Sequence, residues 1–143
     1  MKKSIFGITL FFLFYACDTP CQDASTGPPN FSIEIIDAVS NENVFSNGTF
    51  IESQLQVTSE NSTSLNYSFI AENNLNIIII SPAWEKGTFT TNVKLGDGVT
   101  IPIVSVIKKV SNDCYTNYVI QSVTINNYDY YYDTENYNYK IKI

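Results

Sequence analysis

Histidine and arginine are both absent from this chain of 143 residues, and all eight of its basic residues are lysines. Without histidine, the chain lacks the side chain that most often acts as a general base or activates a Ser or Cys nucleophile. Without arginine, it lacks the planar fork that binds phosphate and carboxylate groups through paired hydrogen bonds. These absences argue against an enzyme, and we predict no catalytic residues, no cofactor and no metal site.

Positive charge is scarce as well: eight lysines stand against fourteen acids, so the whole chain carries a formal net charge of −6. Lys2 and Lys3 lie in an amino-terminal segment that we expect to be removed. Its removal leaves six lysines against fourteen acids, a net charge of −8. A surface of that charge repels a phosphate backbone, so we expect no nucleic-acid partner. For the same reason we expect no electrostatic docking to anionic lipid headgroups.

A short apolar run follows the two amino-terminal lysines. Residues 5–16 contain no charged side chain and would span roughly 18 Å as a helix, which is too short for a bilayer core of about 30 Å. A basic head, a short apolar middle and a small residue at the end, Ala16, are typical of a cleaved secretory signal peptide. We therefore predict a signal peptide over residues 1–16. A buried amino-terminal strand or helix is the alternative.

The stretch Phe14-Tyr15-Ala16-Cys17 resembles the lipobox of bacterial lipoproteins, in which a small residue precedes a cysteine. The resemblance implies cleavage before Cys17, lipidation of its thiol and acylation of the new amino terminus, for example with palmitate. Phe14 and Tyr15 depart from the usual leucine and small residue, although such aromatic versions resemble lipoproteins of the Bacteroidota. We therefore expect a protein of the cell envelope that is anchored to a membrane, with the outer membrane as first choice. Plain secretion after cleavage behind Ala16 is the alternative, and the bulky Phe14 fits it poorly.

The segment after the lipobox is polar and contains proline, so we interpret residues 17–29 as a lipidated tether to a domain over residues 30–143. If Cys17 carries lipid, Cys21 and Cys114 remain. These two cysteines could form a disulfide in a compartment where disulfides persist. Closing so long a loop stabilises a fold by about 4.6 kcal/mol in the chain-entropy estimate. Two unpaired thiols are the alternative.

Short alternating runs separated by turn residues fill the chain from residue 30 onward. This pattern is typical of β-sandwiches and small barrels. Phe31, Ile33 and Ile35 alternate onto one face, and the apolar run at 75–80 predicts a strand covered on both faces. We predict an all-β domain, an antiparallel β-sandwich of immunoglobulin-like or transthyretin-like character with about eight or nine strands.

Residues 36–50, with the sequence IDAVSNENVFSNGTF, are similar to the opening of carboxypeptidase-regulatory-like, transthyretin-like modules. In those modules a turn with Asp and Thr-Gly links the first strands. Asn41 and Asn43 stand here where glycine is usual. The resemblance implies a fold and no activity, because unrelated functions share such folds.

The carboxyl-terminal segment 126–143 predicts a hairpin that turns at 133–136. The predicted register pairs Tyr132 with Tyr137, Tyr130 with Tyr139, Tyr128 with Ile141, and Asp129 with Lys140. Aromatic pairs and opposite charges are the cross-strand combinations that stabilise antiparallel ladders. Because Ile143 ends the chain inside the last strand, we expect truncation there to be destructive.

Two groups of residues are candidates for binding. Trp84 and Tyr131 are expected to project from a loop and from the polar face of the hairpin, where they could stack on a sugar ring. Asp129, Asp133 and Glu135 could offer oxygen ligands to calcium, although turn formation explains Asp133 and Glu135 adequately.

The sequence thus predicts a lipid-anchored, non-enzymatic envelope protein that acts as an interaction or accessory module. Its partner would be a protein or a glycan, in addition to the membrane that holds Cys17. A carbohydrate- or small-ligand-binding lipoprotein that uses exposed aromatics is the second hypothesis. A hydrolase is the third, and the missing histidine disfavours it most.

Overall fold

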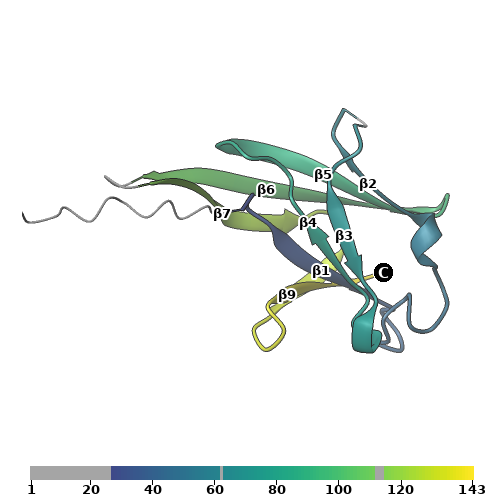
Figure 1. Ribbon diagram of the computed structural model, residues 1–143. Helices are drawn as coiled ribbons and strands as arrows, with labels where there is room; N and C mark the ends of the chain where they lie inside the picture. Colours follow the sequence, from purple (N-terminus) through teal and green to yellow (C-terminus); the bar gives the residue numbers. More distant parts are fainter. Residues whose placement is uncertain (1–26, 62, 112–114) are drawn as a thin grey trace, which may run out of the picture.

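The computed structural model describes residues 27–61, 63–111 and 115–143, which fold into two β-sheets (Figure 1). Within these ranges there are nine strands and two short 3-10 helices, η1 (Glu52–Gln54) and η2 (Glu72–Asn74). The strands are β1 (Phe31–Ile36), β2 (Leu55–Ser59), β3 (Tyr67–Ile70), β4 (Ile77–Ile80), β5 (Gly87–Leu95), β6 (Val99–Ser111), β7 (Thr116–Ile125), β8 (Asp129–Asp133) and β9 (Asn138–Lys142).

The five-stranded sheet has the order β3-β4-β1-β9-β8, and the four-stranded sheet has the order β2-β5-β6-β7. Strands β1 and β9 pair in parallel, whereas the other strand pairs that the structure describes are antiparallel. The two sheets lie face to face in Figure 1. The predicted all-β sandwich and its number of strands are therefore confirmed.

The core forms between the inner faces of the two sheets. Phe31, Ile33 and Ile35 of β1 are all buried, as the alternation of β1 predicts. Most of the fully buried large side chains are β-branched isoleucines, which suit a pleated surface; they are Ile33, Ile35, Ile78, Ile80, Ile101, Ile103 and Ile141. Each contributes roughly 1.5–3 kcal/mol through burial.

Strand β4 differs from its prediction on one face. Ile78 and Ile80 are fully buried, as expected, but Ile77 and Ile79 are only half-buried. A sandwich of two layers leaves the outer face of each sheet toward solvent. The prediction that both faces of β4 are covered was therefore wrong for the outer face.

The connection after β1 owes its shape to polar side chains. The Asp37 carboxylate accepts hydrogen bonds from the N–H groups of Val39 and Ser40, at 3.0 and 2.7 Å. Asn41 then adopts a left-handed conformation with φ 56°, which asparagine tolerates better than most residues other than glycine. Asn41 thus takes the conformation for which glycine is the default.

Asn43, two residues after Asn41, is buried and hydrogen-bonded to neighbouring segments. Its side-chain N–H₂ donates to the carbonyl of Asn76 at 3.3 Å and to the carboxylate of Glu34 at 3.4 Å. Its side-chain oxygen accepts from the N–H of Phe45 at 2.9 Å. One amide therefore ties this connection to β1 and to the residue before β4.

Strand β6 and its neighbour β7 form a long hairpin that extends past the rest of the sandwich (Figure 1). Strand β5 begins at Gly87, which pairs with Ile107, and the β6–β7 register shifts at the same point, between Val106 and Ile107. Such a bulge bends a strand and increases its twist. Beyond Ile107 the hairpin continues with two strands only, as far as Ser111 and Thr116.

The carboxyl-terminal hairpin of β8 and β9 exists as predicted, but its register differs by two positions. Tyr132 pairs with Tyr139, Tyr130 with Ile141, and Asp129 with Lys142. The Asp133 carboxylate accepts from the N–H groups of Glu135 and Asn136 at 2.9 and 3.3 Å, so Asp133 begins the turn as the last residue of β8. A shift of two keeps every side chain on its predicted face.

Ile143 lies just after β9 and is still held by the sheet. Its N–H donates to the carbonyl of Ile36, and its carbonyl accepts from the N–H of Ala38, at 3.0 and 2.9 Å. These two bonds extend the parallel pairing of β1 and β9 to the last residue of the chain.

Candidate functional site

Trp84 and Tyr131, the predicted stacking residues, are both exposed. Trp84 lies between β4 and β5, and Tyr131 lies on β8, the edge strand of the five-stranded sheet. Strands β1 and β9 separate β4 from β8, a distance of roughly 14 Å at ordinary strand spacing. A role of either residue in stacking on a sugar stays a prediction.

Cys17, Cys21 and Cys114 lie outside the described residues, so lipidation and disulfide formation stay predictions. The described residues nearest to Cys21 show where the chain enters the domain. Residues 27–30 line one groove together with Tyr118, Val119 and Ile120 of β7. The chain therefore enters the domain beside the same hairpin whose connection contains Cys114.

The three carboxylates considered for calcium are spread along the hairpin. Asp129 and Asp133 stand at opposite ends of β8, roughly 13 Å apart along a strand. Asp133 is occupied by turn contacts and by Lys140, whose ammonium lies 3.2 Å away. In the described part of the chain, no three Asp, Glu, Cys or His residues gather as metal ligands.

A groove lined by tyrosines, which the sequence did not reveal, lies between the two sheets at the β8–β9 hairpin. It has a volume of about 260 Å³ and is lined by Asn30, Phe31, Ser32, Ile120, Tyr132, Tyr137 and Tyr139. Its walls come from the start of β1, from β7 and from the hairpin. The abundance of tyrosine near the carboxyl terminus was the only sequence signal for it.

The tyrosine rings of this hairpin form a cluster. The ring of Tyr139 lies 4.9 Å from that of Tyr132 and 6.3 Å from that of Tyr130, in tilted arrangements. Burial, together with the charges that Tyr132 and Tyr130 would carry, raises the pKa of Tyr139. The phenol of Tyr139 therefore stays protonated at neutral pH and keeps its O–H as a donor.

Tyr137 is the unusual residue among those that line the groove. Its backbone is left-handed, with φ 53°, and its side chain is 75% exposed. A bulky residue in this conformation is a genuine outlier, since glycine or asparagine adopts it at lower cost. The turn places Tyr137 beside the groove. Its left-handed backbone costs roughly 1–2 kcal/mol.

An ion network on the outer face holds the hairpin against β1. The Lys140 ammonium lies between the carboxylates of Glu34 on β1 and Asp133 on β8, at 3.4 and 3.2 Å. Hydrogen bonds from the Asn136 side chain and the Glu135 N–H lower the pKa of Asp133 to about 2. Burial alone would lower the pKa of Lys140, but the hydrogen bond to Asp133 and the charge of Glu34 outweigh it and raise that pKa.

Asn138 lies between two groove residues in sequence and is 1% exposed. Neither atom of its side-chain amide has a hydrogen-bond partner among the described residues. An unsatisfied buried amide costs about 1–3 kcal/mol. Together with the left-handed backbone of Tyr137, it places two local costs to folding side by side at this end of the hairpin.

Comparison with protein-family models, curated proteins and solved structures gave no match for this chain. The likeness to transthyretin-like modules therefore stays a prediction. Neither of the helices that the structure describes is long or apolar enough to cross a membrane.

Proposed function

We propose that this protein is a lipid-anchored envelope protein whose β-sandwich is a non-enzymatic interaction module. The module contacts a protein partner through the β8–β9 hairpin. The anchor and the contact surface rest on different observations and are tested separately.

The anchor rests on Cys17 and the residues before it. Several acyl chains on one residue give stable membrane attachment, because each buried methylene contributes about 0.8 kcal/mol. Residues 17–27 can span at most roughly 35 Å when fully extended. The anchor therefore keeps the domain close to the bilayer, with β7 beside the point where the tether arrives.

The contact surface rests on the conformation of Tyr137. An exposed tyrosine in a left-handed turn position contributes little to folding, and backbone strain concentrates at functional sites. Tyr137 lines the groove with Tyr132, and the edge strand β8 has three exposed tyrosines, which are Tyr130, Tyr131 and Tyr132. Tyrosine is enriched in protein–protein interfaces because it combines a large apolar ring with a hydroxyl.

Mass spectrometry of the mature amino terminus tests the anchor. We expect a chain that begins at Cys17 and carries acyl groups. The Cys17→Ser variant should accumulate as the unlipidated, uncleaved precursor. Normal acylation of that variant, or a mature chain without acyl groups, would refute the anchor.

Photocrosslinking in the native envelope tests the contact surface. A photoreactive phenylalanine analogue is placed at Tyr137 or at Tyr131, and at Lys94 as the matched control on the outer face of the other sheet. We expect one discrete protein adduct from the hairpin positions that the control lacks. The adduct from position 131 should disappear when Tyr137 is changed to Gly. Equal adducts from all three positions would contradict the proposal.

Carbohydrate binding is the second candidate, and the tyrosine groove favours it. Tyr132, Tyr137 and Tyr139 surround a space of about 260 Å³, which is near the lower limit for small-ligand sites. A glycan array with the purified protein separates the two candidates. Binding to a defined glycan that is lost in Tyr137→Gly would favour the second candidate over the first.

A disulfide between Cys21 and Cys114 belongs to the same proposal. Residues 27–30 run beside β7, and Cys114 lies four positions before Tyr118. Both cysteines are thus within about 20 Å of chain from a shared groove. Thiol labelling of the denatured protein before and after reduction tests the bond. We expect two thiols to appear on reduction only.

A further inference from the structure

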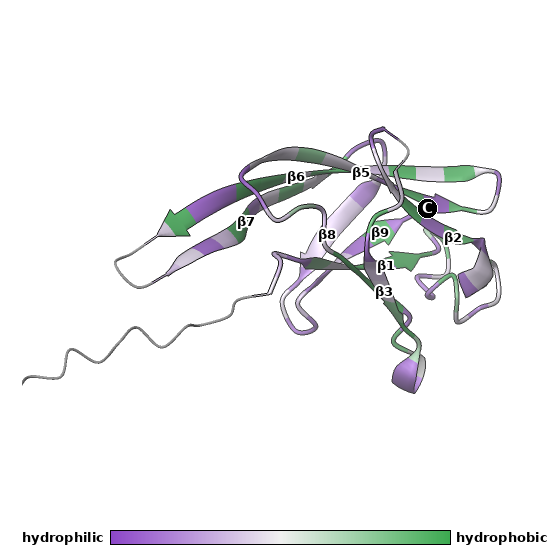
Figure 2. Cartoon of the chain, turned by 45° about the horizontal axis from the view of Figure 1, so that its top comes forward, coloured by the Kyte–Doolittle hydropathy of each residue, from purple (hydrophilic) through white to green (hydrophobic). Residues whose placement is uncertain are grey.

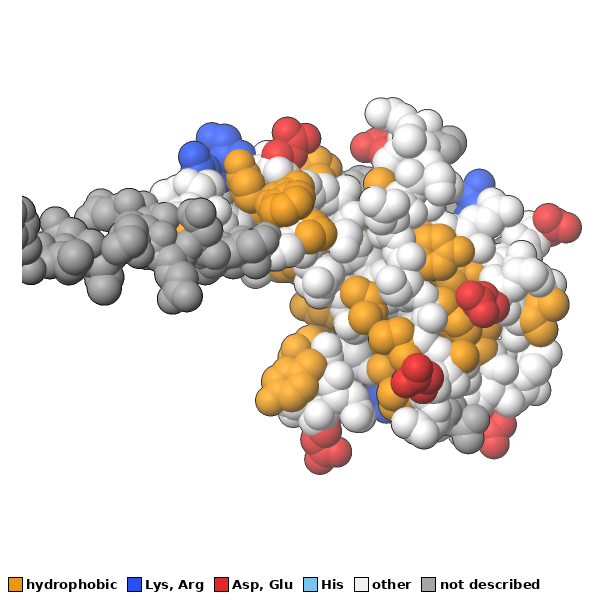
Figure 3. Space-filling view, viewed as in Figure 1, with side chains coloured by type: hydrophobic (Ala, Val, Ile, Leu, Met, Phe, Trp, Pro, Cys, Tyr) orange, Lys and Arg blue, Asp and Glu red, His pale blue; other side chains and the backbone are white. Residues whose placement is uncertain are grey.

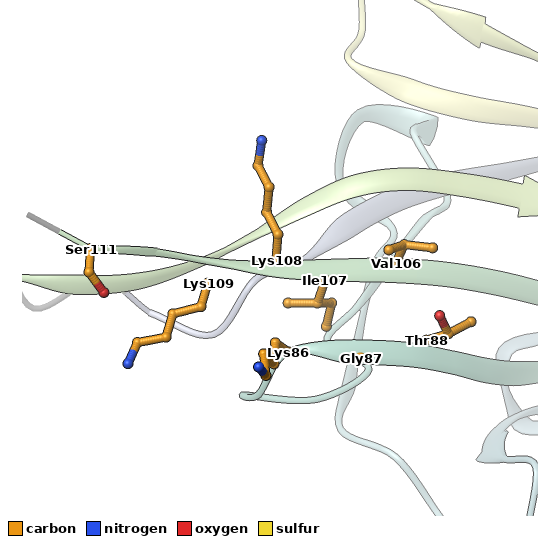
Figure 4. Close-up of a pocket in the computed structure, with 8 residues that line it drawn as sticks. All are labelled: Lys86, Gly87, Thr88, Val106, Ile107, Lys108, Lys109 and Ser111. Atoms are coloured by element: carbon orange, nitrogen blue, oxygen red, sulfur yellow. The ribbon is translucent and has the colours of Figure 1, made fainter.

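Strand β6 has an open edge where it runs past the start of β5. Strand β5 begins at Gly87, opposite Ile107. Figure 4 shows the chain turning back at Lys86 while β6 continues. From Lys108 to Ser111, β6 pairs with β7 on one side, and no described strand pairs with it on the other. A free edge of this kind is a place where a further strand can add to a sheet.

The backbone of β6 turns hydrogen-bonding groups to this edge. The carbonyl of Pro102 on β6 accepts a hydrogen bond from the N–H of Asn126, which follows β7. Because the backbone groups of successive residues point to opposite sides of a strand, even-numbered residues of β6 face β7 and odd-numbered residues face β5. Beyond Ile107, the odd-numbered residues are Lys109 and Ser111. Their N–H and C=O groups face the open edge, where no backbone group of a described residue pairs with them.

The open edge is also the positive part of an acidic molecule. Residues 84–88 and 106–111 contain three lysines and one acid, Glu85, for a net charge of +2. The other described residues have three lysines against ten acids, a net charge of −7. Figure 3 shows lysines gathered at the projecting end and carboxylates spread over most of the rest. The three lysines at the edge are exposed, and none forms an ion pair with a described residue; they are Lys86, Lys108 and Lys109.

A groove of about 690 Å³ lies at this edge and is lined by residues of β5 and β6, among them Lys108 and Lys109. Gly87, the first residue of β5, brings no side chain into it, and an added Cβ there would lie 3.0 Å from the ring of Phe89. Figure 2 shows the projecting part of β6 as mostly hydrophilic, with a hydrophobic stretch near its end, where Val110 is 41% exposed. The edge therefore combines space, main-chain partners and unpaired positive charge.

We propose that this edge binds an extended acidic segment of a partner protein, which adds to the four-stranded sheet as a strand beside residues 108–111. Strand addition gains affinity from main-chain hydrogen bonds and specificity from alternate side chains. Lys108 and Lys109 extend from opposite faces of β6 (Figure 4). Since consecutive side chains of an added strand also point to opposite faces, two consecutive acids in it can meet both lysines. A ligand lying on one face of the sheet meets only one of them.

A second copy of this chain is a poor occupant of the same edge. Pairing two copies here brings the lysines of both to one ladder, and like charges across strands are destabilising. Lysine on an edge strand commonly protects a protein from such self-pairing. The same charges that repel a second copy attract an acidic segment, so they give the edge its specificity.

The edge contact goes beyond the proposed contact of the β8–β9 hairpin and does not rest on it, because β8 and β9 belong to the other sheet. Loss of the photocrosslinks from the hairpin leaves the edge contact standing. Failure of the peptide experiments below leaves the hairpin contact standing.

Fluorescence anisotropy of labelled peptides tests the contact with the purified protein. The probe is the peptide Thr-Val-Glu-Glu-Val-Thr, and its Gln-Gln analogue is the uncharged control. An exposed ion pair is worth up to about a fivefold change in affinity. We therefore expect saturable binding of the acidic peptide at low salt and roughly tenfold weaker binding of the analogue. No binding of the acidic peptide would mean that the lysines only shield the edge, and would overturn the proposal.

Two N-methylated forms of the acidic peptide distinguish strand addition from attraction between charges. Each form is methylated at alternate amides, one at the odd positions and the other at the even positions. An added strand turns only one of these sets toward β6. We therefore expect one form to lose binding at least tenfold and the other to keep it. Equal binding of the two forms would overturn the proposal.

Variants of the protein test the charges and the backbone separately. Lys108→Gln with Lys109→Gln should weaken binding of the acidic peptide roughly tenfold, whereas Lys94→Gln with Lys142→Gln, an equal charge change elsewhere, should weaken it less than about twofold. Equal effects of the two pairs would contradict the edge as the site.

Lys109→Pro also removes the N–H that faces the open edge, and a proline is tolerated at such a position of an edge strand. It should bind more weakly than Lys109→Gln, which has the same charge and keeps that N–H. Thermal denaturation checks that both variants fold, and the N-methylated peptides test the same hydrogen bonds without any change in the protein. Equal binding by two folded variants would count against strand addition.

Amide hydrogen exchange measured by NMR locates the bound peptide. At saturating acidic peptide, exchange of the Lys109 and Ser111 amides should slow several-fold, because their N–H groups become donors to the added strand. The amides of Lys108 and Val110, which face β7, should change little. Protection at the edge of β2 or β3 instead, or slower exchange at high protein concentration without peptide, would overturn the proposal; the second result would indicate a second copy as the occupant.

Discussion

The two hairpins of this protein, β6–β7 and β8–β9, are made of similar alternating strands but are held in different ways. The β8–β9 hairpin lies against β1 and buries Ile141 completely. The β6–β7 hairpin continues as two strands beyond Ile107, where Lys108 and Lys109 are exposed. Among the described residues of the two hairpins, the left-handed Tyr137 and the unsatisfied Asn138 both lie in the hairpin that β1 holds in place.

The largest expected difference between the hairpins is in core packing. Ile141→Ala should lower the free energy of unfolding by about 2–5 kcal/mol, because it leaves a cavity between the sheets. Val110→Ala at the exposed end of β6 should change it by less than about 0.5 kcal/mol. Urea denaturation of both variants measures the difference. Similar losses would mean that the end of β6 is packed as tightly as β9.

The next largest expected difference between the two hairpins is in backbone strain. Tyr137→Gly should raise the free energy of unfolding by about 1 kcal/mol, since glycine adopts the left-handed conformation without strain. Asn117→Gly, in the extended strand β7, should lower it by about 0.5–1 kcal/mol. Thermal denaturation compares the two variants. A destabilised Tyr137→Gly would show that packing of the tyrosine ring outweighs its backbone cost.

The buried amide of Asn138 gives a smaller contrast of the same kind. Asn138→Leu should raise the free energy of unfolding by roughly 1 kcal/mol, because an apolar side chain of similar size removes an unsatisfied polar group. Asn117→Leu on the half-buried surface of β7 should be close to neutral. A clear loss of stability in Asn138→Leu, measured by urea denaturation, would reveal a hydrogen-bond partner for the amide.

The smallest expected effect is on the acid response of the β8–β9 hairpin. The pKa of Asp133 is lowered from 3.8 to about 2 in the folded protein, so its contribution is present above about pH 4 and is lost as the pH falls through about 2. Asp133→Asn should therefore show a smaller fall in melting temperature between pH 4 and pH 2. Asp97→Asn, in the β5–β6 turn, is the control and should follow the unaltered protein. An identical fall in Asp133→Asn would contradict the role of the turn.

Much of the fold could be predicted because alternation is a local property of the chain. The burial of Phe31, Ile33 and Ile35, and the presence of the last hairpin, follow from a period of two in the sequence. The register of that hairpin did not follow, because Asp133 could act as a turn residue or as the last residue of a strand. The carboxylate of Asp133 accepts hydrogen bonds from the N–H groups of Glu135 and Asn136, and the residue is the last one of β8.

The candidate site was less predictable than the fold. Trp84 and Tyr131 were predicted as stacking residues because they are aromatic residues in polar surroundings, and both are exposed. The tyrosine groove instead combines residues 30–32, Ile120 and the β8–β9 turn. Segments so far apart in sequence are brought together by strand pairing and by the packing of one sheet on the other, which no local pattern encodes.

The sequence by itself determined the alternation that turns residues such as Ile33 and Ile35 toward the core and the approximate positions of the strands, because both depend on neighbours in the chain. Only the tertiary structure decided that β1 pairs in parallel with β9, that tyrosines enclose a groove, and that three lysines gather at one end of an acidic molecule. Those features depend on which surfaces bury one another, and burial is a property of the folded chain as a whole.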